Sequence, residues 1–229
     1  MFAIRNKMTQ IVKLMSNGCS MNEIVKTAAV ALKEGKIIAV PTDTIYGIAV
    51  LSQNDSAVSS MYDIKGRHCE KPVSICVGSI EDIPKWGKIT FPEGLLHDLL
   101  PGPVTIVMER TPNLNPNLNP DWPTIGIRIP KCKFIQDLAS SCIEPLALTS
   151  ANISSSSSSL SIKEFKELWP SLDLIVDGGI LGQVDPKRLG STIIDLSVKG
   201  HFKVWRSGCS HENTINILQK YGLTEIISS

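Results

Sequence analysis

Apolar residues recur along this chain in two patterns, one with the spacing of a helix and one in short continuous runs. The first helical pattern begins after Ser20, which forms the signature of a capping box with Glu23, and Gly35 is a suitable stop. An apolar run over Ile37–Val40 follows and ends at Pro41. Since this run is too short for a helix, we predict a buried strand there.

The same alternation of helix and strand continues to the end of the chain. Further strands are predicted over Ile45–Val50, Val73–Val77, Val104–Glu109, Thr124–Ile129, Leu146–Thr149, Leu174–Val176, Thr192–Leu196 and His201–Trp205. Further helices are predicted over Asp55–Asp63, Glu93–Leu100, Lys133–Ser141, Ile162–Leu168 and Glu212–Tyr221. This order of elements predicts an α/β or α+β fold around one twisted sheet.

Two loops interrupt the alternation without ending it. Thr111–Pro123 is rich in Pro and Asn, and Ser154–Ser159 is a serine run, but regular elements resume on both sides of each. We therefore expect a single domain over residues 20–229, preceded by a tail over residues 1–19. The tail carries basic residues and no acidic ones, which is typical of a mitochondrial transit peptide. An unstructured start is the alternative.

Composition and charge narrow the class of function. The chain has 229 residues with 42% hydrophobic and 20% charged, an ordinary globular balance. Its net charge of +1 argues against a protein that grips nucleic-acid backbones over a large surface, but it allows a small anionic ligand. The 6 cysteines include no C-x-x-C pair, which indicates a reduced, intracellular protein without a zinc or redox motif. No apolar run reaches the ~20 residues that span a bilayer.

The segment Pro41–Gly47, PTDTIYG, is the first candidate for a binding site. If it continues extended after the strand, Thr42, Thr44 and Tyr46 share one face and present three hydroxyls to a small polar ligand. The alternative is an ordinary β-turn in which Thr serves strand propensity.

Two further segments carry positive charge. The loop Lys65–Pro72 places Lys65, Arg67 and Lys71 around a glycine, which suits a clamp for phosphate or carboxylate; the alternative is a solvated loop. In the strand Thr124–Ile129 the isoleucines share one face and Arg128 lies on the other. A charge there needs a partner, either an acidic residue elsewhere or a ligand anion.

Polar residues also stand at three strand ends. Ser150 and Asn152 follow the strand Leu146–Thr149, and the segments Leu189–Thr192 and Trp205–Gly208 each place a polar residue beside a glycine. Strand ends of α/β sheets are where ligands tend to bind, although Ser and Asn also favour turns. The chain has no Walker-type phosphate loop, no G-x-G-x-x-G fingerprint, no nucleophile elbow and no H-E-x-x-H, so a nucleotide would bind by a less common arrangement.

Taken in order, the motifs PTDTIYG, KGR, LLPGPVT, GIRIP, TSAN, GST and WRSG resemble the YrdC-domain family. The resemblance covers nearly the whole chain, from about Ser20 to Gly222, and its detail is similar to the animal branch. It implies a YrdC-like twisted mixed β-sheet with flanking helices and a concave ligand cavity. It also implies a threonylcarbamoyl-AMP synthase, which makes threonylcarbamoyl-AMP and pyrophosphate from L-threonine, bicarbonate and ATP, as the first step of threonylcarbamoyladenosine formation in tRNA.

The resemblance assigns roles by position. It implies a threonine site formed by Thr44, Cys76, Arg128, Leu148 and Ser191. It implies an ATP site formed by Arg67, Lys71, Thr124, Ser150, Ser158 and Arg206. It implies a catalytic group formed by the K-x-R pair, Lys65 and Arg67, and the S-x-N pair, Ser150 and Asn152. Relatives often carry a glycine soon after S-x-N, and here a serine run stands instead, which leaves the register of Ser158 open.

The resemblance also implies the cofactor and the partners. We expect Mg²⁺ to arrive with ATP, and a separate tRNA threonylcarbamoyl-transfer complex to take the product, with weak contact to tRNA itself. We expect a cytoplasmic protein with a mitochondrial pool, and no transmembrane segment. The competing interpretation is an RNA-binding or regulatory module without catalysis.

Overall fold

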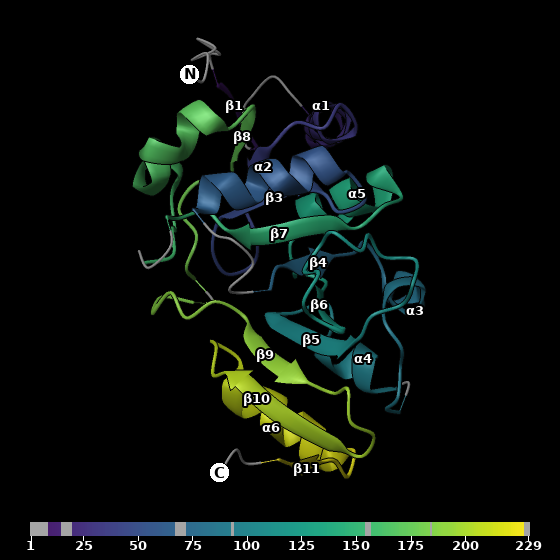
Figure 1. Ribbon diagram of the computed structural model, residues 1–229. Coiled ribbons are helices and arrows are strands. Elements are labelled where there is room, and N and C mark those ends of the chain that lie inside the picture. The colour runs from purple at the N-terminus through teal and green to yellow at the C-terminus, as the bar shows by residue number, and fades with distance from the viewer. Residues whose placement is uncertain are drawn as a thin grey trace.

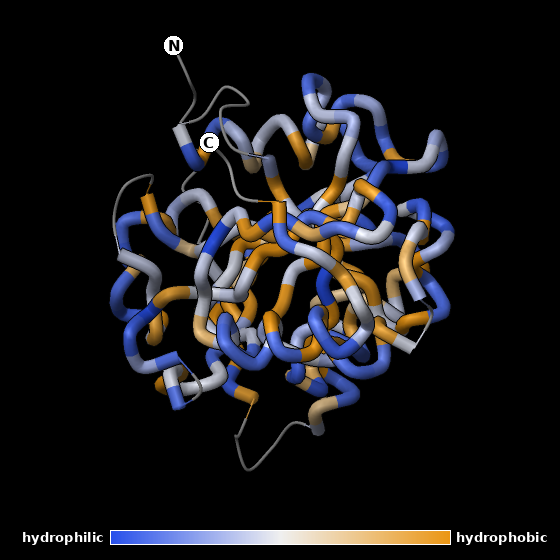
Figure 2. The backbone as a smooth tube through the Cα atoms, turned by 90° about the horizontal axis from the view of Figure 1, so that it is seen from below, coloured by the Kyte–Doolittle hydropathy of each residue, from blue (hydrophilic) through white to orange (hydrophobic). Residues whose placement is uncertain are grey.

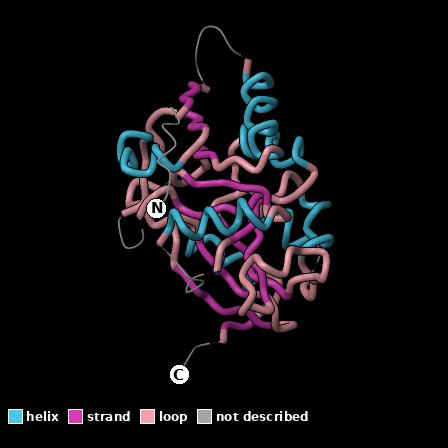
Figure 3. Tube along the Cα trace, turned by 45° about the horizontal axis from the view of Figure 1, so that its top comes forward, coloured by secondary structure: helices cyan, strands magenta, loops and turns pink. Residues whose placement is uncertain are grey.

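The computed structural model describes residues 9–14, 20–66, 72–92, 94–153, 157–183 and 185–226. Within these ranges it holds one 11-stranded mixed sheet in the order β1-β8-β2-β3-β7-β4-β6-β5-β9-β10-β11 (Figure 1). Parallel and antiparallel neighbours both occur, for example β5 with β9 and β5 with β6. The strands run through the middle of the molecule with helices around them (Figure 3), so the expected α/β fold with a twisted mixed sheet and flanking helices is confirmed.

The elements follow the predicted order closely. The strands are β1 Gln10–Lys13, β2 Ile38–Val40, β3 Gly47–Leu51, β4 Ser74–Cys76, β5 Val104–Glu109, β6 Thr124–Arg128, β7 Leu146–Ser150, β8 Leu174–Asp177, β9 Thr192–Asp195, β10 His201–Arg206 and β11 Thr224–Glu225. The helices are α1 Met21–Lys33, η1 Ile80–Asp82, α3 Ile83–Trp86, α2 Asp55–Lys65, α4 Gly94–Leu99, α5 Lys133–Cys142, η2 Ile162–Ser171 and α6 His211–Lys220, where η marks a 3₁₀ helix.

The start of α1 shows how the sequence specifies a helix. The side-chain oxygen of Ser20 accepts from the backbone N–H of Glu23, and the Glu23 carboxylate accepts from the backbone N–H of Ser20 at 2.7 Å. The predicted capping box is therefore confirmed, and two donors that a helix start leaves unpaired are satisfied. The buried residues of α1, among them Ile24, Ala28 and Leu32, lie on one stripe that faces the sheet.

The two faces of the sheet are buried by different helices. On the first face, alternate residues such as Ile48, Ile106 and Ile127 pack in the larger core cluster with α2, α4, α6 and η2. On the second face, α1 and α5 pack on β8, β2, β3, β7 and β4 in a smaller cluster. Among the described residues, none from β5, β6, β9 or β10 belongs to that smaller cluster. Apolar backbone segments gather inside and hydrophilic ones outside (Figure 2).

Several elements differ from the sequence predictions, among them the short helices η1 and α3, which were not predicted. Gln10–Lys13, inside the predicted tail, forms the edge strand β1 and pairs in parallel with β8; its side chains are mostly exposed, so no apolar alternation marked it. Ile162–Ser171 consists of two 3₁₀ segments that meet at a kink at Phe165 (φ −128°, ψ 36°), and Pro170 lies in the second segment. The short β11 was also not predicted. The transit function of residues 1–19 stays a prediction.

Candidate functional site

A cavity of about 490 Å³ opens on the half of the second sheet face that α1 and α5 leave uncovered. Several strands or strand ends contribute to its wall: Ser74 in β4, Thr105 in β5, Arg128 in β6, Ser150 in β7, Ser191 just before β9 and Arg206 in β10. Segments that are far apart in the sequence, including most of the motifs singled out above, therefore converge on one hollow.

The Pro41–Gly47 segment reaches the cavity as a tight turn and not as an extended strand. The Thr42 hydroxyl accepts from the backbone N–H groups of Thr44 and Ile45 and donates to the Ile45 carbonyl at 2.7 Å. The Tyr46 hydroxyl accepts from the Gly178 N–H. The predicted row of three free hydroxyls is therefore wrong, because Thr42 and Tyr46 use theirs to fix the backbone.

The Thr44 hydroxyl remains next to the charged centre of the site. It lies 3.2 Å from the Thr42 hydroxyl and 3.5 Å from Nη2 of Arg128, and Thr44 is fully buried. The turn therefore places the Thr44 hydroxyl beside the guanidinium of Arg128. Of the three predicted hydroxyls, only that of Thr44 lies next to the charged residues of the site.

Arg128 is paired with Asp43, which belongs to the same turn. Nη2 of Arg128 donates to Oδ1 of Asp43 at 2.7 Å, and Oδ2 accepts from the backbone N–H of Lys131 at 2.8 Å. The two side chains are only 8% and 4% exposed. Of the two partners that the sequence left open for Arg128, the acidic residue is present. The Nε of Arg128 is buried without a hydrogen-bond partner among the described residues, and the residue also lines the cavity.

Lys65 ends α2 and ties this helix to the S-x-N turn. Its ammonium donates to the Ser150 carbonyl at 2.7 Å, to the Asn152 carbonyl, and to Oδ1 of Asn152 at 3.3 Å. Gly66, in the left-handed conformation, terminates the helix immediately afterwards. The buried Lys65 therefore sets the shape of the turn from which Ser150 faces the cavity.

Ser191 and Arg206 form the opposite wall. The Ser191 hydroxyl lies 2.8 Å from the Thr105 hydroxyl, and Arg206 donates through Nε to the Ser191 carbonyl and through Nη2 to the Ser191 hydroxyl at 3.0 Å. Burial, and then the positive charge of Arg128, lower the pKa of Arg206. Two arginines that repel each other across one cavity provide an electrostatic site for an anion.

Two glycines allow the wall at Arg206 to close up. Gly190 has φ +73°, and a Cβ there would lie 3.0 Å from Nη2 of Arg206. A Cβ on Gly208 would lie 2.3 Å from the backbone of Ser191 and Thr192. The buried carboxylate of Asp185 holds this loop by accepting from the N–H groups of Leu189 and Gly190. The GST and WRSG motifs thus pack directly on each other, which is why each needs its glycine.

The remaining predicted site residues are found in three kinds of location: in the cavity, away from it, or outside the described residues. Arg67 and Lys71 fall outside the part of the chain that the structure describes. Leu148 lines the cavity, whereas Cys76 is fully buried in the smaller core cluster, where burial raises the pKa of its thiol to about 12. Thr124 and Ser158 do not line the cavity; the Ser158 carbonyl accepts from Arg188 at 3.0 Å.

Sequence reasoning missed Asp43, Thr105 and Trp205 as residues of the site. Asp43 stands in a motif that was considered only for its hydroxyls, although a buried Arg on a strand asks for a carboxylate. Thr105 is the polar member of the alternating strand Val104–Glu109, which is a signal that could have found it. Trp205 also follows an alternation, since it lies opposite the core residues Phe202 and Val204 of β10, and this signal could have placed it on the cavity face.

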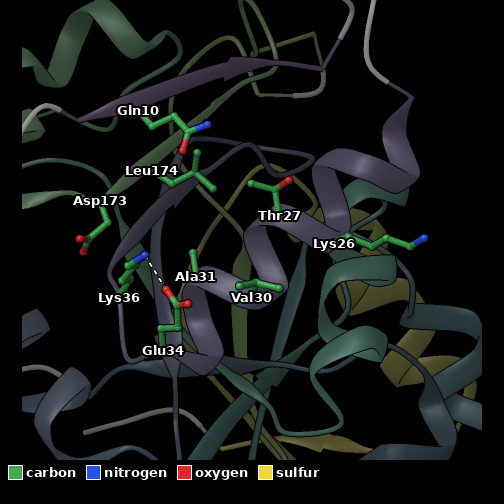
Figure 4. Close-up of a pocket in the computed structure, with 9 residues that line it drawn as sticks. All are labelled: Gln10, Lys26, Thr27, Val30, Ala31, Glu34, Lys36, Asp173 and Leu174. Atoms are coloured by element: carbon green, nitrogen blue, oxygen red, sulfur yellow. Dashed lines mark ion pairs between the residues drawn. The ribbon is translucent and has the colours of Figure 1, made fainter.

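A second cavity, of about 560 Å³, lies between α1 and the β1–β8 edge (Figure 4). Gln10, Thr27 and Asp173 are among its lining residues, and an ion pair between Lys36 and Glu34 crosses its rim at 2.5 Å. It contains no residue of the convergent motifs, and Val30, which faces it, is largely exposed. We therefore take the smaller cavity as the candidate site.

Two further properties of the described ranges bear on function. No helix there has the length and apolar character needed to cross a membrane. No three side chains of the metal-ligating types His, Cys, Asp and Glu come together there in a way that could hold a metal ion.

Comparison with known proteins gives consistent matches. The family model Sua5_yciO_yrdC, described as "Telomere recombination", matches residues 30–208. The chain is 52% identical over 203 residues to the threonylcarbamoyl-AMP synthase of Bos taurus and 51% identical over 204 residues to that of Homo sapiens. These alignments cover 88% of this chain and 74% and 73% of the two relatives.

A solved structure supports the fold independently. The chain superposes on P. abyssi Sua5 complexed with L-threonine with a TM-score of 0.79 at 26% identity, over 95% of this chain and 63% of that one. The chain therefore spans less than two thirds of that Sua5 protein.

Proposed function

The chain belongs to the Sua5/YciO/YrdC family, and from this premise we propose that it is a threonylcarbamoyl-AMP synthase acting on L-threonine, bicarbonate and ATP. The observation that carries the proposal is the pair of arginines, Arg128 and Arg206, facing one cavity of about 490 Å³. Both substrates bring negative charge to a common centre, a carboxylate on the amino acid and a triphosphate on the nucleotide. Two separated cations in one hollow suit that combination.

We assign the amino-acid end of the cavity to Arg128. The guanidinium of Arg128, which lines the cavity, would bind the carboxylate of threonine, while Asp43 and the buried Thr44 hydroxyl hold the guanidinium from behind. Ser191, with its hydroxyl between Thr105 and Arg206, lies where the two substrates would meet.

We assign the nucleotide end to Arg206 and to the turn that Lys65 holds. Arg206 would offset phosphate charge, Ser150 would donate from the turn, and the K-x-R arginine, Arg67, would add a further cation. Lys65, already donating to the Ser150 and Asn152 carbonyls, would act by shaping the turn and by its charge. Asn152 would act with it. Lys71, Thr124 and Ser158 remain proposed ATP contacts, and Cys76 and Leu148 proposed threonine contacts.

The reaction needs no protein nucleophile. The amine of threonine and bicarbonate give a carbamate and water, forming the N–C bond. A carbamate oxygen then attacks the α-phosphorus of ATP, the bond to the bridging oxygen of the β-phosphate breaks, and pyrophosphate leaves with the electron pair. The protein positions the two reactants, offsets developing charge and keeps water from the labile carbamate.

We expect Mg²⁺ to enter with ATP as part of the substrate, because Mg²⁺ keeps several waters and binds largely through substrate phosphates. When bound, it would neutralise charge on the leaving pyrophosphate. We further propose that a tRNA threonylcarbamoyl-transfer complex consumes the product and that contact with tRNA itself is weak. We propose that the protein is cytoplasmic and that part of it is mitochondrial. Fusing residues 1–19 to a reporter protein and measuring its import into mitochondria would test the second location.

The test is pyrophosphate release from ATP and Mg²⁺, with threonine and bicarbonate added separately and together, and mass detection of the nucleotide product. Release that requires both, with a threonylcarbamoyl adenylate appearing, supports the proposal. Turnover indifferent to threonine would reassign the substrate. No turnover together with salt-sensitive RNA binding would support a binding module.

A further inference from the structure

Trp205 lies in the wall of the candidate cavity, immediately before Arg206. Its side chain is 38% exposed, so a large aromatic surface remains uncovered inside a hollow. An uncovered indole loses the hydrophobic stabilisation that a buried one would give, so its location calls for a physical reason.

A β-bulge allows Trp205 and Arg206 to share this wall. Val204 pairs with Ile194 and Arg206 pairs with Ile193, which leaves Trp205 as the extra residue between them. In a regular strand consecutive side chains point to opposite faces, so one of Trp205 and Arg206 would enter the apolar core. The bulge instead lets both line the cavity, and bulges commonly re-aim side chains beside binding sites.

The indole is backed by a second aromatic ring. Trp122 lies at a centroid distance of 5.8 Å from Trp205 with an interplanar angle of 58°. Trp122 comes from the loop Thr111–Pro123, whose shape is set by Arg110: its guanidinium donates to the carbonyls of Leu114, Asn115, Leu118 and Asn119. The support behind Trp205 is thus a loop fixed by several hydrogen bonds.

We propose that Trp205 is the stacking platform for the purine base of the nucleotide, an inference that rests on the proposed function. Trp205, Arg206, Ser191 and Arg128 all line the cavity, and Arg206 also donates to the Ser191 hydroxyl. This set of side chains provides an aromatic surface for the base, a cation for the phosphates and a second cation for the amino-acid carboxylate. Every base has a π-face, so stacking alone does not distinguish adenine from guanine.

The experiment compares the affinities of the full-length wild type, Trp205→Ala, Trp205→Leu and Trp205→Phe for MgATP, MgGTP and inorganic tripolyphosphate by calorimetry. Stacking on an aromatic side chain is worth roughly a tenfold change in affinity or more. We expect the Ala and Leu variants to bind MgATP about tenfold more weakly, the Phe variant to stay within about threefold of wild type, and tripolyphosphate affinity to change less than about twofold. Trp205→Leu keeps an apolar contact for Trp122, so it remains informative if Trp205→Ala unfolds.

Intrinsic fluorescence supplies the matched control. Wild type and Trp169→Phe, which alters a tryptophan on η2 away from the cavity, should both be quenched by MgATP, whereas Trp205→Phe should lose most of the quenching. Equal weakening for MgATP and tripolyphosphate, or unchanged MgATP affinity in Trp205→Leu, would overturn the proposal. A wild type that binds no MgATP at all would instead refute the proposed function.

Discussion

The second face of the sheet has two halves that are used in opposite ways. Over β8, β2, β3, β7 and β4, the helices α1 and α5 pack on side chains such as Ala49 and Leu146 and exclude water. Over β6, β5, β9 and β10, the corresponding positions include Arg128 and Thr105 and remain open as a cavity. The first face is apolar behind both halves, for example at Ile48 behind the covered half and at Ile106 behind the open half. The difference teaches that the site is a gap in the helix layer, held rigid by strands whose other face is core.

The largest effect should come from breaking the ion pair in the open half. Arg128→Ala leaves the Asp43 carboxylate buried without its cation, which should cost about 3–5 kcal/mol in the free energy of unfolding. It should also raise the threonine requirement roughly tenfold or more, since a charged hydrogen bond is lost. Denaturant unfolding and threonine-dependent pyrophosphate release measure the two effects.

A double variant separates them. Asp43→Asn combined with Arg128→Met removes both charges and should recover most of the stability without recovering threonine binding. Wild-type threonine affinity in Arg128→Ala would show that the amino-acid end has been assigned to the wrong residue.

The covered half should respond to volume and not to charge. Leu138→Ala on α5 should lower the free energy of unfolding by about 2–5 kcal/mol, because it opens a cavity in a close-packed cluster. The KM values for threonine and ATP should stay unchanged at temperatures where the variant is folded. Val30→Ala on α1, at a position 55% exposed, is the control and should shift stability by less than about 0.5 kcal/mol. A large change in KM for Leu138→Ala would contradict the division of the face into two halves.

Arg206 should matter for binding much more than for folding. Arg206→Met should raise the KM for ATP about tenfold, by removing a charge-assisted contact worth roughly 1.5–3 kcal/mol. Unfolding should change less than for Arg128→Ala, because Arg206 forms no ion pair among the described residues and the nearby buried Asp185 keeps its hydrogen bonds from Leu189 and Gly190. The double variant Arg206→Met with Trp205→Leu tests whether phosphate and base contacts add; a loss no larger than that of either single variant would show that they do not act on separate parts of the nucleotide.

The smallest effect concerns the cysteines. Burial raises the pKa of Cys76 from the ordinary 9.0 to about 12, so its neutral thiol stabilises the fold fully below pH 9, and this stability is lost as the pH rises toward 12. The unfolding free energy of the wild type should therefore fall more steeply above pH 9 than that of Cys76→Ala. Near neutral pH the burial of Cys76 should be seen in its rate of alkylation. Peptide mapping should find the half-buried Cys209 modified well before Cys76. Equal alkylation rates would show that the covered half opens often enough to make Cys76 as accessible as Cys209.

Many elements could be predicted from the sequence where hydrophobic periodicity or a helix cap alone determines the local structure. Val104–Glu109 is a strand with the predicted bounds, and the capping box of Ser20 and Glu23 is formed as expected. Arg128 was correctly placed opposite the isoleucines of its strand. In each case the periodicity or the cap is contained within a few consecutive residues.

What the sequence could not supply depends on partners far along the chain. The hydroxyls of Thr42 and Tyr46 were counted as free because the backbone groups that engage them appear only in the folded turn and at Gly178. The choice of Asp43 as the partner of Arg128 joins residues 85 positions apart. The bulge that turns Arg206 to the same face as Trp205 is set by pairing with β9, so the alternation within β10 does not reveal it.

The hydrogen bonds of Arg110 have a consequence for how this protein can change over evolutionary time. Its guanidinium binds backbone carbonyls, which every amino acid possesses, and not side chains of the loop. Many substitutions among the exposed residues of Thr111–Pro123 should therefore preserve the loop's path, while replacement of Arg110 alone should lose it. We therefore expect related sequences to vary in this loop while keeping the arginine before it. Such variation would show that the loop tolerates different side chains and not that its backbone path changes.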